Sequence, residues 1–174
     1  MTATSLQART PASVLTEDDL REMELVKRYG ATDVYINGET AGWHPWVNGL
    51  MIKPYRYETK FGQFVFVLWA PKAAVLGKHR HRGVVTAVTL EGDWGYFEYD
   101  WVARPGDYVV ENPGTIHTLR MGEGAKVAYT VNDSIEFFND DDSLRNIMDV
   151  FSFIDLYVKH CKETGQSVDK RLFY

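Results

Sequence analysis

Three of the five histidines in this chain are spaced so that they could hold a metal ion. His79 and His81 are two residues apart in the string KHRHR, and side chains on a strand alternate between its faces, so both imidazoles would point to the same side. His117, in the string NPGTIHT, is the third candidate. Three neutral imidazoles that meet inside a small barrel can bind a divalent metal. Taken alone, a His-x-His pair is more typical of two solvated surface histidines.

Other polar residues near these strings allow several roles. His44, in the string GWHPW, is expected to be a packing residue, and His160 is expected to be structural, since a cation suits the end of a helix. Glu98 lies in the aromatic string WGYFEYDW, on the same face of a strand as Tyr96. Alternation does not say which face is internal, so Glu98 could be a remote carboxylate ligand, support a ligand histidine, or face outward as a solvated or paired charge.

The segments that would position the histidines are mostly strands. β-branched and aromatic runs, each bounded by Gly, Pro, Asn or Asp, occur at 51–57, 64–69, 84–90, 94–101, 108–110 and 127–131. Short, evenly spaced strands are typical of a sandwich or barrel. We therefore expect a mainly β body.

A helix is expected at each end of this body. Thr16 is a suitable N-cap for a short helix that ends before Gly30, and an amphipathic pattern that Ser143 could cap ends at Gly165. With 174 residues and no repeat or linker, we expect one domain. Its predicted parts are a flexible arm over 1–15, a barrel over 45–135 and a C-terminal helix over 143–165.

Charge and composition argue against several classes of partner. With 19 Lys and Arg against 24 Asp and Glu, the chain lacks the excess of positive charge typical of nucleic-acid binding. No apolar run approaches the ~20 residues that a membrane helix needs. The single cysteine, Cys161, cannot form an internal disulfide, and the first twenty residues lack a signal-peptide pattern, so we expect a cytoplasmic protein. Aromatic residues make up 14% of the chain, which favours an aromatic core, a dimer face or an apolar pocket.

Glycines and turns around the histidines resemble the two motifs of the cupin superfamily. The first motif corresponds to the run from Gly77 to Gly92, and the second to the run from Gly106 to His117. The resemblance implies a mainly β, cupin-type small barrel, which is a double-stranded β-helix or jelly roll, with His79, His81 and His117 as metal ligands.

The chain departs from these motifs at three positions. Thr86 stands where the first motif usually has a glutamate, so we expect the fourth protein ligand to be absent. Asn112 and Met121 replace a proline and an asparagine of the second motif. Three imidazoles would leave three adjacent positions of an octahedral ion open, enough for a substrate and oxygen together.

The run from Lys78 to Leu119 is similar to the family of 2,4'-dihydroxyacetophenone dioxygenase. This resemblance implies a nonhaem Fe(II) enzyme, a homodimer or homotetramer, that uses O2 to cleave a C–C bond of a small aromatic or apolar ketone. An aromatic hydroxyketone would give an aromatic carboxylic acid and formate. The three histidines would be the metal and catalytic residues, and Glu98, Thr86 and Tyr96 would support them or line the pocket.

Two alternatives stay open. One is a noncatalytic zinc-binding cupin sensor domain, such as those attached to bacterial anti-sigma factors, and the other is a β-diketone dioxygenase. The hydroxyl at Thr86 favours an enzyme over the sensor, because a closed zinc site would want a carboxylate as its fourth ligand.

Overall fold

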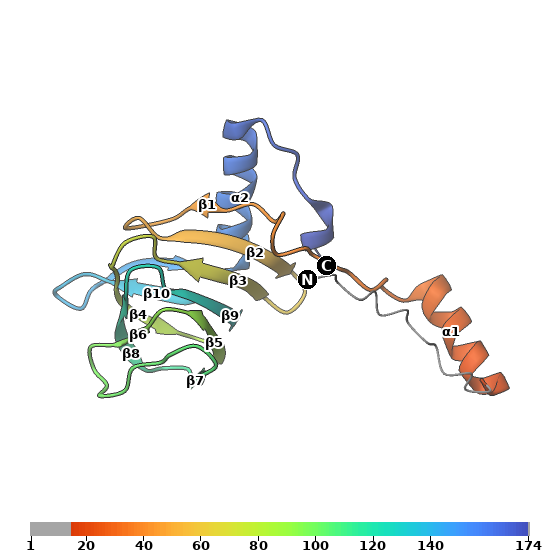
Figure 1. Ribbon diagram of the computed structural model, residues 1–174, viewed down its shortest axis with the longest axis horizontal. Helices are drawn as coiled ribbons and strands as arrows, with labels where there is room; N and C mark the ends of the chain where they lie inside the picture. The colour runs from red at the N-terminus through yellow and green to blue at the C-terminus, as the bar shows by residue number, and fades with distance from the viewer. Residues whose placement is uncertain (1–14, 174) are drawn as a thin grey trace, which may run out of the picture. The chain divides into compact units, whose positions relative to one another are not determined.

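Antiparallel strands form the body of the structure, a computed structural model that describes residues 15–173 (Figure 1). Contacts group the chain into two units, residues 1–35 and residues 36–174. The first unit contains helix α1 (Glu17–Tyr29), and the second contains all eleven strands and helix α2 (Val150–Thr164) found in the described residues. The predicted arm lies outside the described residues except for Leu15, so that expectation stays untested.

Two sheets form the barrel. The six-stranded sheet runs in the order β1 (His44–Pro45), β2 (Met51–Glu58), β3 (Gln63–Trp69), β9 (Lys126–Asn132), β5 (Val85–Glu91), β7 (Tyr108–Glu111). The five-stranded sheet runs in the order β11 (Leu144–Met148), β10 (Ile135–Phe138), β4 (Ala74–His81), β8 (Ile116–Met121), β6 (Trp94–Tyr96). From β3 to β10, successive strands belong to alternate sheets, which is the connectivity of a jelly roll. The expected mainly β fold is confirmed.

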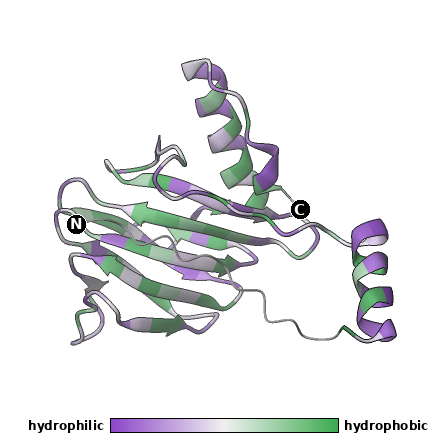
Figure 2. Cartoon of the chain, turned by 45° about the vertical axis from the view of Figure 1, so that its right-hand side comes forward, coloured by the Kyte–Doolittle hydropathy of each residue, from purple (hydrophilic) through white to green (hydrophobic). Residues whose placement is uncertain are grey.

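The core lies between the two sheets and follows the two-residue period of the strands. On β5, Val85 and Ala87 are buried, whereas Thr86 between them is half-buried and Val88 is exposed. Hydrophobic residues occur along the strands of both sheets (Figure 2), and those with buried side chains form one core cluster. This alternation decides which side chains can reach the barrel interior.

The C-terminal helix is shorter than predicted. Residues 144–148 form β11 beside β10, so the predicted start of the helix at Ser143 is wrong. Asp149 caps α2 instead, since its side chain accepts a hydrogen bond from the backbone N–H of Ser152, and Gly165 ends the helix in a left-handed conformation with φ 69°. The apolar pattern was right for the helix body, where Phe153 and Cys161 are buried.

Two further predictions concern the N-terminal helix and the strand over 94–101. The predicted helix near Thr16 is confirmed as α1, whose capping box joins Thr16 to Asp19, and none of its residues is buried. The predicted strand over 94–101 ends at Tyr96.

A short 3₁₀ helix (Lys170–Leu172) follows α2. Within residues 15–173, no helix is long and apolar enough to cross a membrane.

Candidate metal centre

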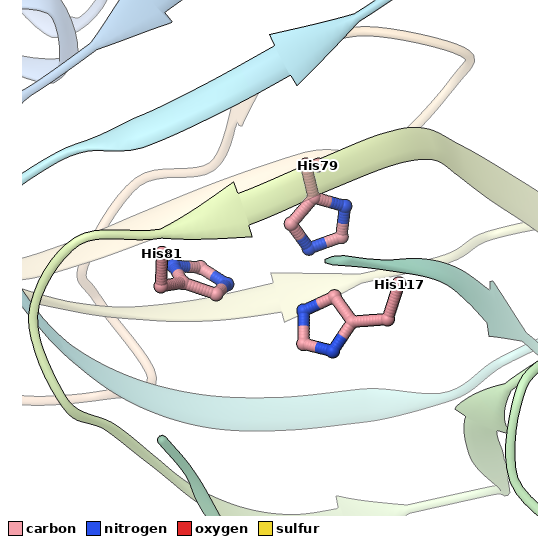
Figure 3. Close-up of side chains that lie close together, drawn as sticks. All are labelled: His79, His81 and His117. Carbon is pink, nitrogen blue, oxygen red and sulfur yellow. The ribbon is translucent and has the colours of Figure 1, made fainter. Parts of the chain in front are cut away.

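The three predicted ligand histidines meet inside the barrel. His79 and His81 project from β4 and His117 from β8 toward one point (Figure 3). One nitrogen of each ring lies within 4.8 Å of the others, and all three residues are buried. The three histidines that the sequence singled out therefore form one buried group that could hold a metal ion.

Strand pairing explains how the cluster forms. His79 lies opposite His117 in the antiparallel pair of β4 and β8, and His81 follows two residues later on the same face of β4. Arg80 points to the other face, where its guanidinium pairs with Glu136 on β10 at 2.5 Å, and Arg82 reaches the same carboxylate at 2.8 Å. These ion pairs hold both arginines on the side of β4 away from the histidine cluster.

The electrostatics keep two of the imidazoles neutral. Burial lowers the pKa of His79 to about 3, helped by the charges of the two other histidines. Burial also lowers the pKa of His117 to about 4, against the opposing effect of Glu111. The His79 Nδ1 atom lies 2.8 Å from the carbonyl oxygen of Gly77, which leaves Nε2 as the lone-pair donor. A neutral imidazole with one nitrogen fixed in this way is the form that binds a metal.

A carboxylate that the sequence interpretation missed faces the same point. Glu111, the last residue of β7, is buried, and its Oε2 lies 3.2 Å from His81 Nε2 and 3.5 Å from His117 Nε2. Burial alone would raise the pKa of Glu111, but the interaction with His81, together with the hydrogen bond from the Tyr96 hydroxyl, holds this pKa below its usual value. The expectation that no carboxylate reaches the histidines is therefore wrong.

Cross-strand register explains this miss. Val85 on β5 is the residue opposite Glu111, and both face the interior. Thr86 pairs with Val110 and Thr130 and lies on the other face of the sheet, so the prediction that Thr86 points to the site is wrong by one position. Strand alternation, counted from His81 through the turn that follows it, could have predicted that Val85, and not Thr86, faces the interior.

Tyr96 supports the cluster from β6. Its ring stacks face to face on the His117 imidazole, with the centroids 3.9 Å apart and an interplanar angle of 4°. Its hydroxyl donates a hydrogen bond of 2.5 Å to Glu111 Oε1. Tyr96 thus fixes one candidate ligand by stacking and a neighbouring carboxylate by hydrogen bonding.

Glu98 has a different place from the one that strand alternation suggested. Because β6 ends at Tyr96, Glu98 lies in the following loop, where it is exposed. Its Oε2 accepts a hydrogen bond of 2.9 Å from the backbone N–H of Thr118, the residue after His117. Glu98 therefore ties this loop to β8 beside the histidine cluster.

Comparisons with known proteins agree with this geometry. The family model of the ChrR cupin-like domain matches residues 31–134, a stretch that includes all three histidines. The chain belongs to this cupin family. No curated protein matches the sequence.

Solved structures place the cupin among proteins of the same fold. An RmlC-like cupin of Ralstonia eutropha is 26% identical, with a TM-score of 0.76 over 80% of this chain and 94% of that one. A second cupin-like protein of Ralstonia eutropha, of unknown function, is 20% identical, with a TM-score of 0.66 over 78% of this chain and 93% of its own. Acetylacetone dioxygenase of Acinetobacter johnsonii is 11% identical, with a TM-score of 0.69 over 75% and 94%. At identities of 20% and 11%, the last two likenesses show the fold alone.

The donor atoms of the cupin site fit a divalent metal. His117 Nε2 and Glu111 Oε2 are buried without a hydrogen-bond partner, an arrangement that a cation would resolve. Two ligands that are each ~2.1 Å from one ion in a tetrahedron lie about 3.4 Å apart. The spacings of 3.2 and 3.5 Å between Glu111 and the two imidazoles match this value. The residues could thus offer three nitrogen ligands and one oxygen ligand.

An open pocket leads to the centre. It has a volume of about 500 Å³, and its inner end is formed by Glu111 and His117. Toward solvent its walls carry Tyr99, Trp101 and Tyr108. The Tyr99 and Trp101 rings stack with 5.7 Å between centroids and 15° between planes. An aromatic entrance that ends at the candidate ligands suits a small, flat organic molecule.

Proposed function

We propose that this cupin is a nonhaem Fe(II)-dependent dioxygenase that cleaves a C–C bond of an aromatic hydroxyketone resembling 2,4'-dihydroxyacetophenone. The products would be an aromatic carboxylic acid and formate. The observation that carries the proposal is the aromatic pocket of about 500 Å³ that ends at His117 and Glu111. A closed structural metal site has no need of such an entrance.

The pocket lining favours an aromatic substrate. Tyr99 and Trp101 offer parallel ring faces, against which an aryl group could stack. Val109 lines the same pocket and adds an apolar contact. The likeness in fold to an acetylacetone dioxygenase is compatible with a ketone substrate, and a β-diketone therefore stays an alternative.

The reaction balances without an external reductant. The substrate ArC(O)CH2OH and O2 together contain the atoms of ArCOOH and HCOOH, with one oxygen atom from O2 entering each product as the C–C bond breaks. Fe(II) held by His79, His81 and His117 would supply the one-electron chemistry that O2 requires.

The protein's own groups would prepare the substrate. Glu111 Oε2 has no hydrogen-bond partner and faces the inner end of the pocket, where it could accept the proton of the substrate hydroxyl. Its other oxygen is held by the Tyr96 hydroxyl, so the carboxylate keeps a fixed orientation. Stacking of Tyr96 on His117 holds that imidazole in place and excludes water from its face.

A noncatalytic zinc-binding cupin is the second candidate function, and Glu111 is the observation in its favour. Three histidines with one carboxylate would give four protein ligands, and a closed tetrahedral site with four protein ligands is typical of structural zinc. The hydroxyl at Thr86 therefore does not argue against a sensor, because Glu111 on β7 could supply the carboxylate that a closed zinc site needs.

Metal analysis and oxygen labelling separate the two candidates. Protein purified without oxygen should contain iron. The iron-loaded protein should consume one O2 per aromatic hydroxyketone and place one labelled atom in each product, and the zinc-loaded protein is the control. Zinc in the purified protein, with no oxygen uptake after loading with Fe(II) for either hydroxyketones or β-diketones, would favour the sensor.

We also propose a cytoplasmic homodimer or homotetramer. Val88 and Leu90 on β5 and Val110 on β7 are exposed on the outer face of the six-stranded sheet, a place where a second copy could pack. Sedimentation at micromolar concentration should give a mass of at least two chains. A mass of 19.9 kDa, that of one chain, would contradict this proposal.

A further inference from the structure

A small internal cavity adjoins the histidine cluster on the core side. Its volume is about 20 Å³, and its lining includes His79, His81 and Tyr129. The wide pocket that opens to solvent instead reaches His117 and Glu111. The two spaces therefore approach the cluster through different histidines. A cavity needs roughly 10–15 Å³ to hold one water molecule, so this one has room for about one.

Two residues that line this cavity each carry a buried polar atom that has no hydrogen-bond partner among the residues that the structure describes. One is the hydroxyl of Tyr129, and the other is Nδ1 of His81. Leaving such atoms unpaired is unfavourable, so buried polar groups without a protein partner usually bind ordered water. The remaining lining residues are mostly aliphatic or aromatic, including Leu68, Leu76, Leu119 and Val131.

His81 differs from His79 in how its ring is fixed. His79 Nδ1 faces the carbonyl oxygen of Gly77 at 2.8 Å, which sets its tautomer and ring orientation. His81 Nε2 is the nitrogen directed toward Glu111, so its Nδ1 must carry the hydrogen when Nε2 binds a metal. Within residues 15–173, no protein group accepts a hydrogen bond from this nitrogen, although ligand histidines almost always have such a partner.

Tyr129 could provide the missing partner of His81 Nδ1 from the sheet opposite that of His81. It lies on β9 and faces the interior opposite Ala87. Its ring is held by Phe66 and Trp94, at 5.8 and 5.7 Å between centroids. The hydroxyl therefore has a fixed position, and it can accept a hydrogen bond from water as well as donate one.

We propose that one buried water fills this cavity and joins His81 Nδ1 to the Tyr129 hydroxyl, which makes Tyr129 a positioning residue of the metal centre. His81 Nδ1–H donates to the water oxygen, and the water and the hydroxyl share a second hydrogen bond. The link fixes the tautomer that leaves Nε2 free for the metal. This inference rests on the metal site and not on the proposed oxygenase reaction.

Metal affinity tests the link without reference to turnover. Tyr129→Phe keeps the ring and removes the hydroxyl, so it should weaken metal binding about tenfold, the lower end of the range seen when such supporting groups are lost. Tyr57→Phe is the matched control, because Tyr57 is also buried. Its hydroxyl donates a hydrogen bond of 3.3 Å to the carbonyl oxygen of Phe153, at the α2 end of the barrel. The control should bind metal like the unaltered protein in competition with a chelator for Zn²⁺ or Fe²⁺.

A crystal structure of the unaltered, metal-loaded protein provides a second test, which stands even if the Tyr129 variant does not fold. It should show one water within hydrogen-bond distance of both His81 Nδ1 and the Tyr129 hydroxyl. An empty cavity, or equal metal affinities for folded Tyr129→Phe and unaltered protein, would overturn the proposal. Because these measurements use either metal, failure of the oxygenase reaction would leave them unaffected.

Discussion

The molecule buries histidines in two places, and only one of them has the geometry of a metal centre. His117 lies inside the barrel and His44 lies on β1, with 2% and 1% of their surfaces exposed. Burial is the main cause that lowers the pKa of each to about 4, and each has an Nε2 atom without a partner. Single-residue properties therefore do not distinguish them.

The surroundings of the two residues differ. His117 shares its space with His79, His81 and the Glu111 carboxylate, so four donor groups converge. His44 packs near the rings of Tyr157 and His160, with centroids 6.0 and 5.9 Å away. Burial makes an imidazole neutral in both places, but a metal site also needs several lone pairs directed at one point. The predictions below test this difference.

The largest expected effect is on metal binding. Changing His79, His81 or His117 to Ala removes one of the converging donors and should weaken metal binding on the order of a thousandfold, since each ligand carries several kcal/mol of the binding free energy. His44→Ala should bind metal like the unaltered protein. Elemental analysis after dialysis measures both. A full metal content in His117→Ala, or a loss of metal in His44→Ala, would contradict the assignment of the metal centre to the barrel histidines.

The second prediction concerns pH and the His44 region. The pKa of His44 is about 4 in the folded protein and about 6.5 when unfolded, so the unfolded state binds the proton first as pH falls. The contribution of His44 is fully present above pH ~6.5 and is lost progressively toward pH ~4, by about 3 kcal/mol.

His44→Leu separates this contribution from those of the other histidines. Its free energy of unfolding, from urea titrations at pH 7 and pH 4.5, should fall less between the two values than that of the unaltered protein. Equal pH dependence in the two proteins would mean that His44 is protonated as easily when folded as when unfolded.

The sequence allowed the mainly β fold and the three imidazoles to be predicted, because local spacing and the two cupin motifs together indicate them. His79 and His81 share a face through the period of a strand, and the family resemblance brought in His117. Glu111 could not be found in the same way, since it reaches the site by pairing with Val85 across two strands. The end of β6 at Tyr96, which moved Glu98 into a loop, also depends on tertiary context. The strand 144–148 was taken for helix because its pairing with β10 leaves no local pattern.

The third prediction concerns the carboxylate that distinguishes the barrel site from the His44 region. Glu111→Gln keeps the shape and the hydrogen bond from Tyr96 but removes the negative charge, so metal binding should weaken about tenfold. Glu98→Gln is the matched control, since Glu98 binds the backbone of Thr118 outside the cluster. Chelator competition measures both variants. Equal affinities in the two would show that Glu111 does not contribute to holding the metal.

The smallest effect is expected at Thr86, and it tests the strand register. Thr86→Glu places a carboxylate on the outer face of β5, so metal affinity should stay within about twofold, as is normal for a surface change distant from the site. Val85→Glu places the same group on the inner face opposite Glu111, where an extra negative charge should tighten metal binding. Val85→Gln controls for size and should not tighten it. If metal affinity rises in Thr86→Glu and stays unchanged in Val85→Glu, the register of β5 is shifted by one residue. The carboxylate then belongs at position 86, as the motif alone suggested.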